Sequence, residues 1–160
     1  MQLEITSVEL YKLSIPLKQP FVISLGPQYD ADNVIVVINT NAGIKGWGEC
    51  SPYMSINGES MDTCFIVGQD LAKALKGKDP LQIEDCINAM ERIITRNESI
   101  KSAFDMALYD IAAQHAGLPL YKFLGGEKNK RISTDMTVGL GSPEKMAAEA
   151  VEYKAAGFPS

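Results

Sequence analysis

Residues 33–52 hold two runs typical of β-strands, joined by a turn that is too short for a helical crossover. The first run, NVIVVINT, is rich in β-branched residues, and the second, IKGWGECSP, follows it after Asn41-Ala42-Gly43. Parallel neighbours in a sheet need a connection of about a dozen residues or more, so the short turn predicts an antiparallel pair. Because the earlier run LEITSVELYKLSIPL also alternates as a strand does, we predict a three-stranded antiparallel meander.

Two stretches around these runs are predicted to be loops. Residues 21–32, FVISLGPQYDAD, contain a Gly-Pro pair, and residues 53–60, YMSINGES, contain an Asn-Gly pair.

The middle of the chain has helical patterning and capping signals. A first helix is predicted from about Ser60 to Lys76, where Gly77 ends it. A second helix is predicted to open at the sequence DPLQ, with Asp79 as cap and Pro80 as first helical residue.

A third helix is predicted after Asn97, and it carries an aspartate on a stripe of small residues. Ala103 and Ala107 share this stripe with Asp110, which permits close packing against another element. Asp110 is either a general base or metal ligand, or a structural hydrogen-bond anchor. The anchor is favoured because no second carboxylate stands at helical spacing. His115, the only histidine, lies in the last turn, where a surface or capping role is favoured over catalysis.

The pattern changes again near the end of the chain. Residues 131–140, RISTDMTVGL, predict a strand, and residues 142–157 predict a helix with Ser142 as cap, Pro143 as first residue and Gly157 as stop. A strand followed by a helix is half of a βαβ unit. We therefore expect the front part of a longer chain; the alternative is a small α+β protein whose last strand joins the first sheet.

Composition narrows the classes of partner and the cellular setting. A net charge of −5 and a pI of about 4.9 argue against nucleic acid and anionic membranes, which both bind basic patches. The opening residues lack the apolar core of a signal peptide, and nothing approaches the ~20 apolar residues of a membrane span. Cys50, Cys64 and Cys86 lack metal-site spacing, so we expect them to be reduced and packed, in a cytoplasmic protein.

One stretch carries a resemblance to a known family. Residues 102–126, SAFDMALYDIAAQHAGLPLYKFLGG, closely resemble the end of the N-terminal capping domain in the muconate-lactonizing subgroup of the enolase superfamily. GIKGWGECSPY resembles the third strand and following loop of that domain, and SPEKMAAEAVEYKAAGF resembles the first barrel helix. The resemblance implies an α+β capping domain over residues 1–127, with Asp110 holding the fold. Residues 128–160 would then begin a truncated TIM-like (β/α)7β barrel with its first β-α unit.

The resemblance also implies a chemistry. Family members remove a proton α to a carboxylate, and Mg²⁺ stabilises the resulting enediolate between two lysine bases. The Lys-x-Lys motif, the second lysine and the metal carboxylates of the family would all lie beyond Ser160. We therefore expect no catalytic residue and no metal ligand within these 160 residues.

The two capping-domain loops of the family close over the barrel mouth and select substrate. The sequence Ile-Asn-Gly-Glu-Ser in the second loop, and the strand STDMTVGL, most resemble the dipeptide epimerases. The substrate-binding residues that this resemblance implies are Phe21, Gly26, Tyr53, Ile56 and Thr137. Without the resemblance, the apolar members of this set could simply close the edge of the sheet.

The first loop bears on which dipeptide is bound. Epimerases that prefer Ala-Glu carry an arginine where this chain has Gly26, so we expect a small or apolar dipeptide such as Ala-Ala. Lys18 could supply the missing charge instead.

Two other functions stay open at this stage. A cycloisomerase or an o-succinylbenzoate synthase would share the fold and the lysines, and a non-catalytic α+β module would apply if the chain truly ended at Ser160. The apolar face formed by Met146, Ala150 and Tyr153 counts against the module, because it needs a cover. We expect a small-molecule dipeptide as partner, with no nucleic acid and no membrane. Because many relatives form closed oligomers, a homo-oligomer stays open.

Overall fold

The computed structural model describes residues 2–128 and 130–158, and they form two compact units. Residues 2–14 and 32–127 make the first unit, and residues 15–31 with 128 and 130–158 make the second.

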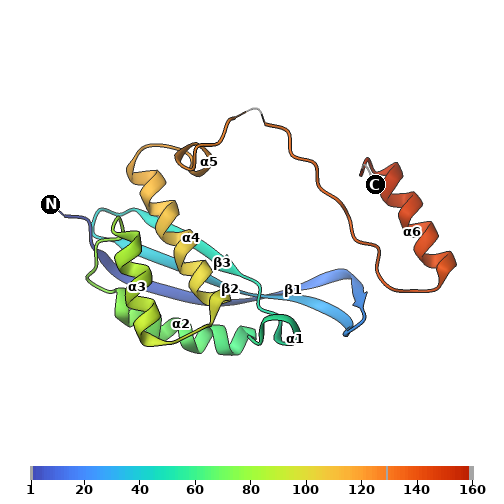
Figure 1. Ribbon diagram of the computed structural model, residues 1–160, viewed down its shortest axis with the longest axis horizontal. Helices are drawn as coiled ribbons and strands as arrows, with labels where there is room; N and C mark the ends of the chain where they lie inside the picture. The colour runs from blue at the N-terminus through green and yellow to red at the C-terminus, as the bar shows by residue number, and fades with distance from the viewer. Residues whose placement is uncertain (1, 129, 159–160) are drawn as a thin grey trace. The chain divides into compact units, whose positions relative to one another are not determined.

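The strands form a three-stranded sheet in the order β1-β2-β3, as Figure 1 shows. They run over Ile5–Ile23 (β1), Gly26–Thr40 (β2) and Lys45–Cys50 (β3). β2 and β3 are antiparallel, and their register pairs Val34 with Cys50. The predicted meander is therefore confirmed.

The predicted loop over residues 21–32 is wrong. β1 continues to Ile23 and β2 begins at Gly26, so only Ser24 and Leu25 form the turn of a hairpin. Gly26 has a φ of +115°, which an L side chain rarely adopts. The Gly-Pro pair lies directly after the two-residue turn, at the start of β2, and the residues around it belong to strands.

Three longer helices pack on one face of the sheet (Figure 1): α2 (Met61–Leu75), α3 (Ile83–Ile93) and α4 (Glu98–His115). Single helical turns form α1 (Met54–Asn57) and α5 (Leu120–Phe123). α1 lies inside the second predicted loop, which is thus partly helical. Within the described ranges, no helix is long and apolar enough to cross a membrane.

Two helix starts illustrate local capping. α2 begins close to its predicted start, and Ser60 caps it: the Ser60 Oγ accepts from the N–H of Thr63 at 3.2 Å, and the Thr63 hydroxyl accepts from the N–H of Ser60 at 2.8 Å. The predicted start of α3 is wrong, because α3 begins at Ile83. Asp79 instead closes a separate turn, in which its Oδ1 accepts from the N–H of Leu81 at 2.9 Å.

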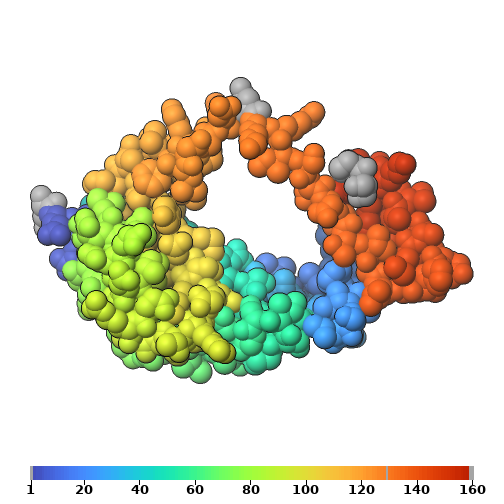
Figure 2. Space-filling view, viewed as in Figure 1, coloured from blue at the N-terminus to red at the C-terminus, as the bar shows by residue number. Residues whose placement is uncertain are grey.

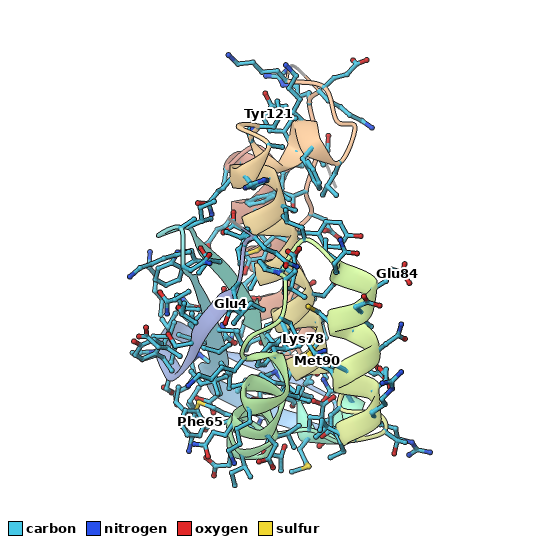
Figure 3. The ribbon with its side chains drawn as sticks, turned by 90° about the vertical axis from the view of Figure 1, so that its left-hand side faces the viewer. Glu4, Phe65, Lys78, Glu84, Met90 and Tyr121 are labelled. Carbon is cyan, nitrogen blue, oxygen red and sulfur yellow. The ribbon has the colours of Figure 1, made fainter. Side chains whose placement is uncertain are left out.

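The core lies between the sheet and the helices. Figure 3 shows Met90 on the inner side of α3, whereas Glu84 points away to solvent. In Figure 2, α2, α3 and α4 pack side by side without a visible gap. The largest fully buried apolar side chains of the core are Ile5, Val34, Val36, Ile38, Leu71, Leu75, Met90, Ile100, Phe104, Leu108 and Ile111.

The closest contact in the first unit joins α4 to β3 through small residues. A Cβ added at Gly48 would lie 1.8 Å from the carbonyl oxygen of Ala103, and one at Gly46 would lie 2.1 Å from that of Ala107. The two backbones therefore touch directly, as the small-residue stripe on α4 predicted.

Asp110 extends the same contact as a hydrogen-bond anchor. Its Oδ2 accepts from the backbone N–H of Trp47 at 3.0 Å, and Gln114 Nε2 donates to the carbonyl oxygen of Lys45 at 2.7 Å. The structural role favoured for Asp110 is thus confirmed. His115 is exposed at the last residue of α4, which confirms its predicted surface position.

Replacing Asp110 tests this assignment. Asp110→Ala leaves the N–H of Trp47 without its acceptor, and we expect it to lower the free energy of unfolding by about 1–2 kcal/mol. Asp110→Asn keeps an oxygen that can accept from this N–H, so its loss of free energy of unfolding, measured by urea denaturation, should be less than half that of Asp110→Ala. Equal losses for both variants would mean that the charge, and not the hydrogen bond, stabilises the fold.

The three cysteines are free and buried, as the sequence predicted. Burial raises the pKa of the Cys86 thiol to about 11. Cys86 is therefore protonated and unreactive at neutral pH.

The second unit holds the hairpin tip and the end of the described chain. Its helix α6 (Pro143–Ala155) is capped by Ser142, whose Oγ accepts from the N–H of Lys145 at 3.3 Å. Gly157, at φ +100°, follows the helix as predicted. None of the residues of α6 is buried.

The strand predicted over residues 131–140 is wrong. The segment carries no strand assignment, and its one backbone bond to the hairpin that the structure gives is from Leu140 N–H to the carbonyl oxygen of Val22, at 2.8 Å. The sequence pattern favours a strand, but a strand also needs a neighbour along its length. No described residue pairs with residues 131–139 in a ladder.

Candidate functional site

A cavity with a volume of about 610 Å³ lies within the second unit. It is lined by β1 residues 17–22, by residues between 135 and 140, and by one side of α6. Phe21 and Thr137, both predicted to bind substrate, line it together. Phe21 is 37% exposed, so an apolar surface is available to a ligand.

Charges of both signs surround this cavity. Lys18 and Lys145 contribute the cations, and Asp135, Glu149 and Glu152 contribute the carboxylates. Lys145 Nζ lies 3.8 Å from Glu149 Oε1, whereas no salt bridge is found for Lys18 among the described residues. Lys18 is therefore the cation of this cavity that is available to pair with an anionic group.

Gly26 does not line the cavity. It lies at the first position of β2, next to the hairpin turn, and its backbone has open space around it. An arginine at this position would be strained by the positive φ, which agrees with the absence of a side chain.

Tyr53 and Ile56, the other predicted binding residues, belong to the first unit. Tyr53 is the N-cap residue of α1, and Ile56 lies on α1 with 73% of its surface exposed. Figure 2 shows the segment around them, in teal to green, at the surface beside α2.

Two residues in this segment were not predicted from the sequence. Asn57 Oδ1 accepts from the N–H groups of Tyr53 and Glu59, each at 3.1 Å, and its Nδ2 donates to Ser99 Oγ at 2.8 Å. Glu59 is only 6% exposed. The Asn-Gly-Glu motif was the available signal, but its partner Ser99 lies 40 residues beyond Glu59.

Glu59 is held by two donors. Its Oε1 accepts from the N–H of Ser99 at 3.0 Å, and its Oε2 accepts from the thiol of Cys64 at 3.2 Å. Burial, followed by this hydrogen bond, raises the pKa of Cys64 well above its ordinary value. The thiol thus stays a donor, and the carboxylate lies at the positive end of α4.

The described residues do not provide a ligand set for Mg²⁺. No cluster of three or more Cys, His, Asp or Glu side chains that could hold a metal occurs in residues 2–128 and 130–158. Mg²⁺ prefers octahedral oxygen coordination, so no catalytic step through the metal follows from these residues.

The sequence itself matches a known family. Residues 5–125 match the domain described as the N-terminal domain of mandelate racemase / muconate lactonizing enzyme. The chain belongs to this family. The family lies in the enolase superfamily, which confirms the resemblance and the α+β capping fold.

Several relatives in the family are dipeptide epimerases. The chain is 60% identical to the D-Ala-D/L-Ala epimerase of Cytophaga hutchinsonii over 96% of its own length, and 41% identical to the L-Ala-D/L-Glu epimerase of Bacillus subtilis over 98%. A crystal structure of the dipeptide epimerase from Cytophaga hutchinsonii, complexed with Mg and D-Ala-L-Val, superposes with a TM-score of 0.94 over 97% of this chain. The chain spans 42–43% of the length of these relatives.

Proposed function

We propose that this chain is the N-terminal part of a Mg²⁺-dependent dipeptide epimerase. Such an isomerase moves a proton off and back onto the α-carbon of the C-terminal residue of a dipeptide. The observation that carries the proposal is the 60% identity to a D-Ala-D/L-Ala epimerase across nearly the whole chain. The bases and the Mg²⁺ ligands would be supplied by parts of the enzyme outside residues 1–160.

The role of the present residues is to bind the substrate and exclude water. The capping domain would be residues 1–127, and residues 128–160 would begin the barrel; the family match over residues 5–125 supports this division. Phe21 and Thr137 would bind the dipeptide from the cavity they share. Tyr53 and Ile56 are proposed as further substrate contacts because the resemblance to the dipeptide epimerases implies them. Water exclusion strengthens the electrostatic interactions that stabilise a developing carbanion.

The substrate is proposed to be a small or apolar dipeptide such as Ala-Ala. The Cytophaga relative, at 60% identity, is named for Ala-Ala, whereas the 41% identical Bacillus relative is named for Ala-Glu. Gly26 offers no charge for a glutamate side chain, and its positive φ disfavours any replacement. The cytoplasmic setting and a homo-oligomeric state stay predictions.

The test incubates the complete enzyme with Mg²⁺ and one dipeptide at a time in D₂O, and it compares the rates of exchange. We expect deuterium to enter the α-position of the C-terminal residue, with kcat/KM for Ala-Ala about tenfold or more above that for Ala-Glu, because an unpaired carboxylate is costly to desolvate. Removal of Mg²⁺ with a chelator should stop the exchange. Exchange into no dipeptide would contradict the function, and a preference for Ala-Glu would contradict the specificity and point to Lys18.

A further inference from the structure

The segment that carries Ile56 has little to stabilise it by itself. α1 spans four residues, none of them buried, and the side chain of its N-cap residue does not cap the helix. So short a helix is not stable alone in water, because nucleating it costs more free energy than the hydrogen bonds of a single turn recover. Its conformation must therefore be imposed by the contacts around it.

Asn57 supplies three of those contacts. One side chain closes the loop on itself through the N–H groups of Tyr53 and Glu59, and its amide donates to Ser99 on the first turn of α4. Gly58, at φ +77°, lets the chain reverse directly after Asn57. Asn57 thus both closes the loop and attaches it to α4.

Glu59 makes a second attachment at the same place. Its buried carboxylate accepts from the backbone N–H of Ser99, so both the backbone and the side chain of Ser99 hold the segment. α4 in turn lies in backbone contact with β3 at Gly46 and Gly48. The loop is therefore fixed to the most tightly packed helix of the unit.

We propose that Asn57 and Glu59 are positioning residues for substrate recognition. They clamp residues 53–58 onto the first turn of α4 and so hold the exposed side chain of Ile56 where it packs against the dipeptide. This inference rests on the proposed function, which makes Ile56 a substrate contact. Neither residue touches the reacting atoms.

A double-mutant cycle in the complete enzyme tests the proposal. The variants are Asn57→Ala, Ile56→Ala and the double variant, each assayed for kcat and KM with the dipeptide that the wild type prefers. We expect Asn57→Ala and Ile56→Ala each to raise KM about tenfold with kcat changed less than about twofold, since binding is weakened equally in the ground and transition states. The double variant should raise KM no further than Ile56→Ala does, because both act through one side chain.

The chain offers a matched control in Asn41. This asparagine also joins two segments of the chain through its amide: its Oδ1 accepts from the N–H of Glu4 at 3.1 Å, and its Nδ2 donates to the carbonyl oxygen of Gln2 at 3.0 Å. Asn41→Ala should lower thermal stability as much as Asn57→Ala does and leave KM unchanged. Equal KM values for the two asparagine variants would overturn the proposal, and so would additive losses in the double variant.

The same assay separates this inference from the function on which it rests. A wild-type enzyme that turns over no dipeptide refutes the proposed function, and the positioning role with it. A wild-type enzyme that is active, together with an Asn57→Ala variant of unchanged KM, refutes the positioning role alone.

Discussion

Replacing Gly48 with alanine is expected to lower the free energy of unfolding by about 3 kcal/mol or more. The new Cβ would lie 1.8 Å from the carbonyl oxygen of Ala103, 2.8 Å from its carbonyl carbon and 3.1 Å from the nitrogen of Ala107. All three are backbone atoms within α4, so no side-chain rotation relieves the overlap. Only a displacement of the helix from β3 would, and that would open the core between them.

Guanidinium denaturation of two further glycine variants tests the cause. Gly46→Ala should cost nearly as much, because its Cβ would lie 2.1 Å from the carbonyl oxygen of Ala107. Gly68→Ala should cost clearly less, since its closest neighbour is the end of the Leu10 side chain at 2.8 Å, which can move. If Gly48→Ala and Gly68→Ala lower the free energy of unfolding equally, the backbone contact between α4 and β3 is not the cause of the loss.

Replacing Glu59 with alanine is expected to lower the free energy of unfolding by about 3 kcal/mol. The carboxylate is 6% exposed and accepts from the N–H of Ser99 and the thiol of Cys64. Its loss leaves the partly buried N–H of Ser99 without its acceptor at the start of α4, where Asn97, the N-cap residue, makes no side-chain capping bond. The favourable interaction of the negative charge with the helix dipole is lost as well.

Glu84 provides the matched control for that variant. Like Glu59, it is a carboxylate beside the N-terminus of a helix, but it belongs to the first turn of α3, is exposed and points to solvent (Figure 3). Glu84→Ala should cost only about 0.3–1 kcal/mol in thermal or chemical unfolding. Glu59→Gln should fall between the two, because its amide oxygen can serve only one of the two donors. A cost for Glu59→Ala no greater than that for Glu84→Ala would contradict its capping role.

Local sequence signals predicted the features that depend on neighbours along the chain. Ser142 was predicted as a cap, and it caps α6 by accepting from the N–H of Lys145, three residues further along the chain. The small stripe with Ala103 and Ala107 predicted a close contact on α4, and Asp110 was predicted as its anchor. Where one residue had two local options, as Asp79 did, the sequence could not decide between a helix cap and a turn.

Features that depend on distant pairing were predicted less well. The hairpin through Ser24 and Leu25 appeared as a loop, because its strands are stabilised by each other and not by a local pattern. Residues 131–140 were predicted as a strand for the converse reason: the sequence pattern of a strand is present, but none of the residues that the structure describes pairs with them as a neighbouring strand. Of the candidate site, Phe21 and Thr137 do share a cavity, whereas Asn57 and Glu59 were missed because both depend on Ser99.

The contact between α4 and β3 also sets an order of events during synthesis. Trp47 and the Asp110 that anchors it are 63 residues apart, so β3 leaves the ribosome on the order of 3 to 13 seconds before its helix does, at about 5–20 residues per second. In that interval two glycines leave β3 with little side-chain surface of its own to pack. The nascent sheet is complete before the helix that covers it has been translated. Translation speed between codons 47 and 110 therefore determines how long the uncovered face of the sheet is open to other chains.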